Sequence, residues 1–147
     1  MKINPKKDRF QAFPAGAYEG ILNSLTVGDS RFEPDEGEEQ EEAIIADISF
    51  SYVNSDGEQV DGSRTEEFTR GVLDLLRGLS PNGEAKWVDK LPTDDEGNLE
   101  IPTDSDDNVL INGQIADGWD VIFHMTSRRR EGRTYNRIGR LRLAARA

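Results

Sequence analysis

The arginines near the C-terminal end are the residues whose type and spacing best suit a chemical task. Positions 121–147 hold eight arginines and one glutamate, a local charge of +7, whereas the whole chain has a net charge of −11. These arginines are Arg128, Arg129, Arg130, Arg133, Arg137, Arg140, Arg142 and Arg146. A guanidinium donates two parallel hydrogen bonds to a phosphate and stacks on flat rings. We therefore predict that this segment forms a phosphate-binding surface.

Aromatic residues extend this prediction to single-stranded nucleic acid, where charge follows the phosphates and rings stack on unpaired bases. Tyr135 lies within the arginine segment, and Tyr52, Phe68 and Trp87 are further candidate rings. For Tyr135, core packing remains an open alternative, and for Phe50, Trp119 and Phe123 it is the preferred interpretation. The predicted nucleic-acid-binding residues are Arg128, Arg129, Arg130, Arg133, Tyr135, Arg137, Arg140, Arg142 and Tyr52.

Catalytic chemistry has few candidate residues in this chain. His124 is the only histidine and there is no cysteine, which argues against a structural zinc site. His124 lies within the predicted strand 119–126, opposite its apolar face, where a histidine is more often a solvated residue than a general base. An EF-hand loop fails at both acidic loops, because a glycine at its sixth position would place Gly57 or Pro92 first. We expect no catalytic residue, no metal and no cofactor, and hence no enzyme.

Apolar periodicity predicts a small set of elements. Residues 43–53 alternate apolar and polar side chains, which is typical of a half-buried strand. Val72, Leu75, Leu76 and Leu79 follow the helical spacing i, i+3, i+4 and i+7. The full prediction is a set of strands at 17–27, 43–53, 60–69, 119–126 and 133–143, a helix at 71–79, and a turn at 127–132.

The last predicted strand has two chemically different faces. Strict alternation places Leu141 and Leu143 in the core. It places Arg140 and Arg142 on the outer face together with Asn136. The arginines of positions 128–133 are then expected to crowd the preceding turn.

The chain is expected to be one domain, with an N-terminal arm at 1–15 and a folded part at 16–147. Acidic loops are expected at about 28–42 and 84–108, and we find no internal repeat. Five strands with one short helix between the third and fourth indicate an all-β protein with an OB-fold barrel.

Several segments are similar to one known family. Residues 13–21, which read Phe-Pro-Ala-Gly-Ala-Tyr-Glu-Gly-Ile, the strand 43–53, the helix 72–79 and residues 132–138 resemble bacteriophage OB-fold single-stranded DNA-binding proteins associated with replication and recombination. The resemblance implies sequence-tolerant binding of single-stranded DNA in phage DNA replication, recombination or repair. Replication or recombination proteins are then expected partners. The chain departs from this family at its end, which is basic, whereas such proteins commonly end in an acidic tail that recruits partners.

Other functions remain open. The dense acidic segments suit a protein-interaction module that mimics nucleic acid or inhibits a DNA-handling protein, and a virion structural component is a further alternative. The absence of cysteine and of a long apolar run predicts a cytoplasmic protein without membrane association, in the host cytoplasm if it is phage-encoded. The sequence leaves a homo-oligomer, and RNA in place of DNA, as open questions.

Overall fold

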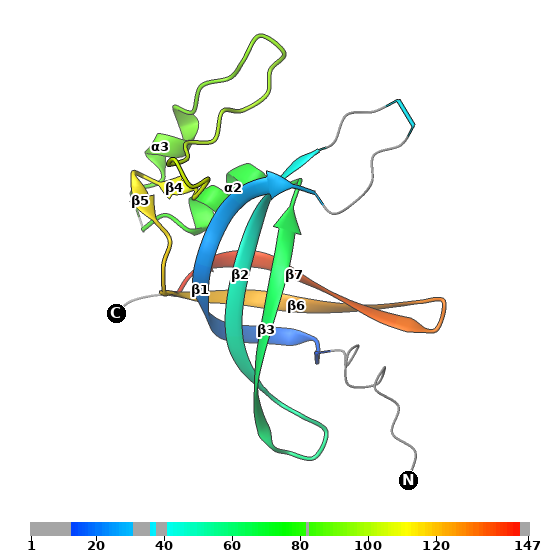
Figure 1. Cartoon of the computed structure of the whole chain (residues 1–147). Helices are drawn as coiled ribbons and strands as arrows, with labels where there is room; N and C mark the ends of the chain where they lie inside the picture. Colours follow the sequence, from blue (N-terminus) through cyan, green and yellow to red (C-terminus); the bar gives the residue numbers. More distant parts are fainter. Residues whose placement is uncertain (1–12, 31–35, 38–40, 82, 145–147) are drawn as a thin grey trace.

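A computed structural model of the chain describes residues 13–30, 36–37, 41–81 and 83–144, with Arg130 and Arg133 described by their backbone only. Five long strands form one antiparallel sheet in the order β3-β2-β1-β6-β7. They are β1 (Gly16–Asp29), β2 (Glu42–Val53), β3 (Gln59–Phe68), β6 (Trp119–Arg130) and β7 (Arg133–Leu143). The sheet is bent into two layers, so that β6 and β7 cross behind β1, β2 and β3 in Figure 1.

The prediction of a mostly β chain with five strands and a helix after the third is confirmed. The closed barrel is not found. β3 and β7 lie at opposite ends of the strand order, and no ladder of backbone hydrogen bonds joins them in the described part. The predicted arm at 1–15 and the first acidic loop fall largely outside the described residues.

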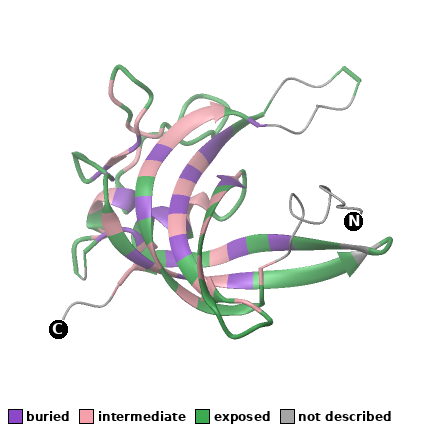
Figure 2. Cartoon of the chain, turned by 60° about the horizontal axis from the view of Figure 1, so that its bottom comes forward, coloured by how far each residue is buried: buried purple, intermediate pink, exposed green. Residues whose placement is uncertain are grey.

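The core lies between the two layers of the sheet. Inward positions of the alternating β2 strand, Ile48 among them, pack against Leu22 of β1 and Phe123 of β6. Figure 2 shows the resulting alternation of buried and exposed bands along the strands. Burial of these apolar side chains removes their surface from water, which is the main force that holds the two layers together.

A short helix, α2 (Val72–Gly78), covers one end of this core. Leu75, Leu76 and Leu79 are buried, as their helical spacing predicts. The helix packs against β7, where a Cβ atom on Gly78 would lie only 2.7 Å from the Leu141 carbonyl oxygen. Neither α2 nor the one-turn helix α3 (Lys86–Asp89), the helices of the described part, is long and apolar enough to cross a bilayer.

A bulge in β7 changes which of its side chains face the core. Ile122 pairs with Arg142 and His124 with Gly139, so two β7 residues stand opposite one β6 residue. Arg140 occupies the extra position with φ of 53°. The bulge reverses the alternation, so Asn136 is buried on one side of it and Leu141 on the other. The predicted exposure of Arg140 and Arg142 is confirmed, while the outward placement of Asn136 is wrong.

The second acidic segment contains a repeat that the sequence analysis missed. Residues 91–100 read LPTDDEGNLE and residues 101–110 read IPTDSDDNVL. In each unit the aspartate after Pro-Thr accepts hydrogen bonds from the backbone amides two and four residues later, all at 2.9 Å. These aspartates are Asp94 and Asp104. The shared Pro-Thr-Asp and Asn at fixed spacing were the signal for this repeat.

Each unit is a tight β-turn closed by the same backbone bonds. In the first, the Asp94 amide donates to the Asn98 carbonyl at 2.9 Å, and in the second, Asp104 donates to Asn108 at 3.0 Å. Hydrogen bonds from Asn98 hold the pKa of Asp94 below its usual range, and the Asn108 side chain and backbone do the same for Asp104. Both aspartates therefore stay ionised as turn acceptors.

The second unit also pairs with β1, the central strand of the main sheet. The Val109 amide donates to the Leu25 carbonyl at 2.8 Å, and the Val27 amide donates to the Asp107 carbonyl at 2.9 Å. β6 pairs with β1 only from Gly16 to Leu22, and these bonds give the rest of β1 a backbone partner on the same side. The chain then forms a small hairpin from β4 (Leu110–Ile111) and β5 (Gln114–Ile115) before it enters β6.

Substituting glycine for Asp107 is expected to stabilise the protein by about 0.5–1 kcal/mol. Asp107 has φ of 63°, and the equivalent position in the first unit is Gly97, with φ of 83°. Glycine adopts this left-handed conformation without the steric cost that a Cβ atom imposes. Urea unfolding of Asp107→Gly measures the gain. Asp106→Gly removes the same charge at a neighbouring position and is the control, and an equal gain there would contradict the explanation.

Candidate nucleic-acid interface

The arginines of the predicted turn lie on a long two-stranded hairpin. β6 and β7 continue to pair through Arg128 with Tyr135, Arg129 with Thr134, and the backbones of Arg130 and Arg133. The turn consists of Glu131 and Gly132 alone, with φ of 54° and 76°. Two positive φ angles in succession are typical of a type I′ turn, whose twist matches that of paired strands. The predicted turn at 127–132 is therefore wrong. We call residues 126–137 the arginine hairpin.

The strand register places part of the predicted site on one face of β6 and β7. Residues that pair directly across two strands lie on the same face, and so do residues two positions apart along a strand. The outer face therefore carries the pairs Ile122–Arg142, His124–Gly139, Thr126–Arg137 and Arg128–Tyr135. Arg129 and Thr134 lie on the opposite face of the hairpin, and Arg140 lies at the bulge.

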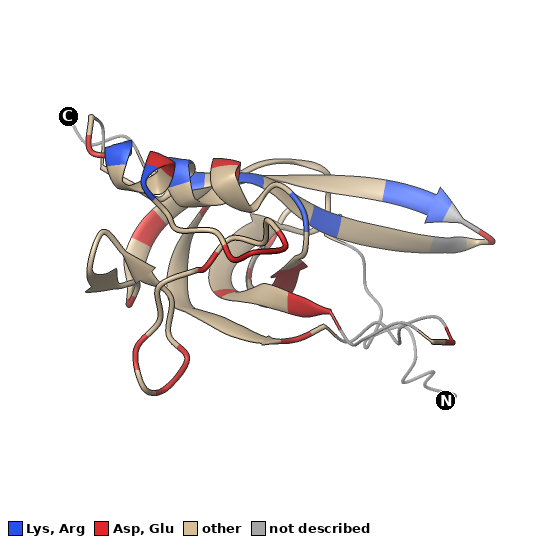
Figure 3. Cartoon of the chain, turned by 90° about the horizontal axis from the view of Figure 1, so that it is seen from above, with Lys and Arg blue, Asp and Glu red and all other residues tan. Residues whose placement is uncertain are grey.

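This outer face is exposed and positively charged. Tyr135 is 50% exposed, and Arg128 and Arg142 are also exposed. Among the described residues no carboxylate forms an ion pair with Arg128, Arg129, Arg140 or Arg142. In Figure 3 both strands of the hairpin carry blue residues and its tip, at Glu131, is red, while further red residues lie on the other layer, on its loops and on the helices. The charge of these arginines is therefore available to an external anion.

We call this outer face of β6 and β7 the arginine face. A hollow lies beside it, between β1 and β6. The hollow has a volume of about 350 Å³, and its lining includes Glu19 of β1 and Ile122, His124 and Arg142 of β6 and β7. Arg142 supplies a positive charge beside the apolar side chain of Ile122. The Glu19 carboxylate lines the same hollow, so its charged groups are of both signs.

Tyr52 lies apart from the arginine face. Its ring is half-buried and packs edge-on against Phe13, with ring centres 5.3 Å apart, and it tilts against Phe50. The rings of Phe68 and Trp87 also pack against the core, and the Trp87 indole donates to the Ser80 hydroxyl at 2.8 Å. Of the rings predicted to stack on bases, Tyr135 is the one that the fold places among the arginines.

Polar side chains of β3 contact β7, and the sequence did not predict this contact. We call it the polar seam. The Glu66 side chain is only 6% exposed, and it accepts from the Arg64 Nε atom at 2.7 Å, with the Arg137 Nε atom 3.7 Å away. Arg64 also donates to the Asn136 carbonyl of β7. Arg137 therefore has a structural role besides its place on the arginine face, because it helps to neutralise a buried carboxylate.

Phe13 enters the same seam. Its amide donates to the Asn136 Oδ1 atom at 2.9 Å, and its carbonyl accepts from Asn136 Nδ2 at 2.9 Å. Nearby, the Tyr18 hydroxyl donates to the Pro14 carbonyl at 2.5 Å. Burial raises the pKa of Tyr18, with a further contribution from Tyr52, so the hydroxyl remains a proton donor. The seam ties the entering chain to the edge of β7.

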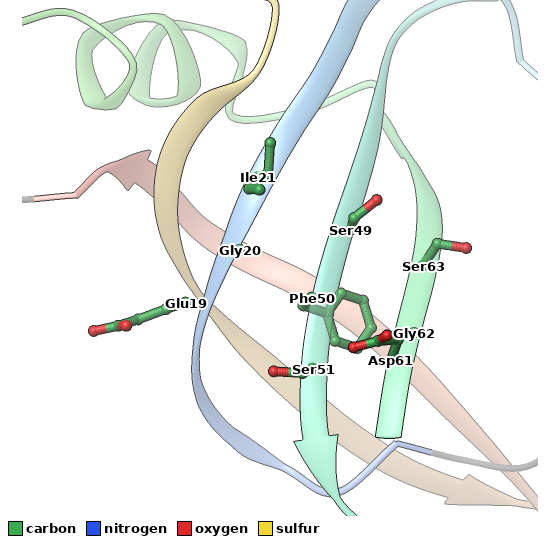
Figure 4. A pocket seen from close by; sticks show the side chains of 9 residues that line it. All are labelled: Glu19, Gly20, Ile21, Ser49, Phe50, Ser51, Asp61, Gly62 and Ser63. Atoms are coloured by element: carbon green, nitrogen blue, oxygen red, sulfur yellow. The ribbon is translucent and has the colours of Figure 1, made fainter. Parts of the chain in front are cut away.

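The outer face of the other layer has the opposite character. A groove of about 790 Å³ runs across β1, β2 and β3, and we call it the β1–β3 groove. Its side chains are hydroxyls, carboxylates, Ile21 and Phe50, and no lysine or arginine lines it; Figure 4 shows Glu19, Ile21, Ser49, Phe50, Ser51, Asp61 and Ser63. Phosphate would be repelled from this groove, because its charged groups are carboxylates.

The described residues hold no cluster of three histidine or carboxylate side chains suited to a metal ion. What the outer face of β6 and β7 presents is a row of guanidinium groups with one exposed phenol ring. Guanidinium groups in general donate hydrogen bonds to anions, and aromatic rings stack on other flat rings. No protein-family model matches the chain, and no curated protein matches it either.

Proposed function

We propose that this protein binds single-stranded DNA without sequence preference, through the outer face of β6 and β7. One observation carries the proposal: strand register aligns Arg128, Tyr135, Arg137 and Arg142 on a single exposed face. Guanidinium groups would bind successive phosphates, and the Tyr135 ring would stack on a base. From Ile122 to Arg128 the face is about 20 Å long at the usual rise per strand residue, enough for several nucleotides.

The same proposal includes an OB-type barrel that stays open between β3 and β7. The order β3-β2-β1-β6-β7, with α2 after the third strand, supports it, as do the side-chain contacts across the seam. In OB folds the hairpin between the last two strands often contacts oligonucleotides, and the arginine hairpin is in that position. A role in phage DNA replication, recombination or repair follows from the family resemblance and belongs to the proposal.

A second candidate function is a protein-interaction module. The β1–β3 groove favours it, because Glu19 and Asp61 provide negative charge with no arginine or lysine among the lining residues. In OB folds the faces of the second and third strands are a common ligand surface. A positively charged protein segment is the ligand whose charge complements this groove.

Affinity for a fluorescent oligo-dT is expected to fall steeply as salt rises from about 0.1 M to about 1 M. Each neutralised phosphate of a single strand contributes a slope of about −0.7 in log K against log salt, so three to five contacts predict about −2 to −4. Fluorescence anisotropy with matched single-stranded and duplex probes measures this slope and the preference for single strands. Undetectable binding to oligo-dT at low salt, or affinity independent of salt, would contradict the proposal.

A further inference from the structure

The distal part of the arginine hairpin, from Arg128 to Tyr135, packs against no other described element of its own chain. The last buried cross-strand pair is Met125 and Ile138, and the last buried residue of β7 toward the turn is Asn136. Closer to the turn both faces of the hairpin are exposed, because Arg128, Arg129, Thr134 and Tyr135 all contact solvent. A two-stranded ribbon without a packed face is only marginally stable in water. The hairpin would therefore gain stability from a surface that covers it.

The three-strand surface that carries the β1–β3 groove is wider than the backbone of such a ribbon. Neighbouring strands are about 4.8 Å apart, so three strands span about 10 Å, while the two backbones of a hairpin are about 5 Å apart. The residues that line the groove all belong to β1, β2 and β3.

Charge and apolar surface match between the two. Glu19 and Asp61 of the groove are carboxylates, and Arg128 of the hairpin is unpaired within the described chain. Ile21 is 43% exposed in the groove and Tyr135 is 50% exposed on the hairpin. A tyrosine beside an arginine is a common energetic centre of protein interfaces, and an exposed isoleucine is a suitable apolar surface for its ring.

The hairpin and the groove of one chain lie on different layers. In Figures 1 and 3 the hairpin belongs to the layer behind β1–β3 and projects away from it, so it points away from its own groove. We propose that the arginine hairpin of one copy docks, by its Arg128 and Tyr135 face, into the β1–β3 groove of a second copy. This contact is head-to-tail, so each added copy leaves one groove and one hairpin free, and the assembly grows.

Sedimentation velocity on the full chain without DNA tests the first consequence. At about 0.1 M salt the mean mass is expected to rise with protein concentration. At about 1 M salt, where the Debye length shortens from about 10 Å to about 3 Å, the monomer is expected to dominate. A monomer at all concentrations and salts would overturn the proposal.

Two complementary variants test the geometry. Arg128→Ala/Tyr135→Ala lacks a competent hairpin, and Asp61→Lys lacks a competent groove, so each alone is expected to remain monomeric. Mixed in equal amounts, they are expected to form a 1:1 dimer and nothing larger, because one intact hairpin meets one intact groove. Circular dichroism verifies that both variants fold. A mixture that stays monomeric, or that grows beyond a dimer, would show that the contact is not the proposed one.

Matched controls separate this contact from general charge effects. Arg129→Ala/Thr134→Ala removes the same charge from the other face of the hairpin, and Asp95→Lys makes the same charge reversal on an exposed turn. Both are expected to associate like the unmodified chain. If either control abolished association, net charge rather than the hairpin and groove would be responsible. Because no DNA is present, the result is independent of the DNA-binding proposal.

Discussion

Replacing Asn136 with alanine is expected to lower the free energy of unfolding by about 3 kcal/mol. The Asn136 side chain accepts from the Phe13 amide and donates to the Phe13 and Thr126 carbonyls, at 2.9, 2.9 and 3.2 Å. Alanine removes all of these hydrogen bonds and leaves the partly buried Phe13 amide and carbonyl without this partner. Loss of a partner from a buried polar group costs about 1–3 kcal/mol. Urea unfolding measures the change.

The substitution also weakens the packing that the seam supports. The Phe13 ring contacts Phe50 edge-on, with ring centres 5.0 Å apart, so a looser Phe13 exposes apolar surface of the core. Asn23→Ala is the matched control, because Asn23 is exposed and makes one side-chain bond to the Ser49 hydroxyl at 2.7 Å. We expect that control to lose less than about 1 kcal/mol. A similar small loss for Asn136→Ala would mean that the seam does not stabilise the fold.

Reversing the charges of Arg128 and Arg142 together is expected to weaken binding to oligo-dT by about 100-fold at low salt. Each charged hydrogen bond to phosphate contributes about 1.5–3 kcal/mol, so each lost contact costs about tenfold or more. The slope of log K against log salt should also become shallower by about 1.4, which corresponds to two single-strand phosphates. Arg137 is left unchanged because its Nε atom lies 3.7 Å from the buried Glu66 carboxylate.

Lys86→Glu/Lys90→Glu is the control for this variant. It makes the same change in net charge on exposed residues at α3, which lies away from the arginine hairpin. Binding should remain within about threefold of the unmodified chain if local contacts dominate, because distant exposed charges are screened by salt. Equal losses in the two variants would show that total charge governs affinity and that the outer face of β6 and β7 is not a binding surface.

Much of the secondary structure was predictable from local patterns. Alternating apolar residues predicted β2 at 43–53, and the structure has it at Glu42–Val53. The leucine spacing predicted α2 and its buried face. Both signals are local, because the period of side-chain burial follows directly from strand or helix geometry. The arginine segment was likewise evident from composition, whereas the exposure of Tyr135 was left open and is a finding of the structure.

The arrangement of the candidate site depended on features that composition does not reveal. The turn was predicted at 127–132, but in the structure it consists of Glu131 and Gly132 alone. The reason is that β6 and β7 remain paired beyond the core, through Arg128 and Tyr135. The repeat at 91–110 was a readable signal, since Pro-Thr-Asp recurs after ten residues, and it was overlooked within an acidic segment. The Glu66 and Asn136 seam joins residues 70 positions apart, which no local pattern could pair.

By itself, the sequence determined where positive charge gathers and which segments form strands, because charge and periodicity are properties of neighbouring residues. Only the tertiary structure decided which arginines share a face. The bulge at Arg140 shifts the alternation of β7 by one residue, so Asn136 turns into the seam while Arg137 and Arg142 share the outer face. A bulge depends on pairing with another strand, and pairing across the sheet cannot be read from one strand's own residues.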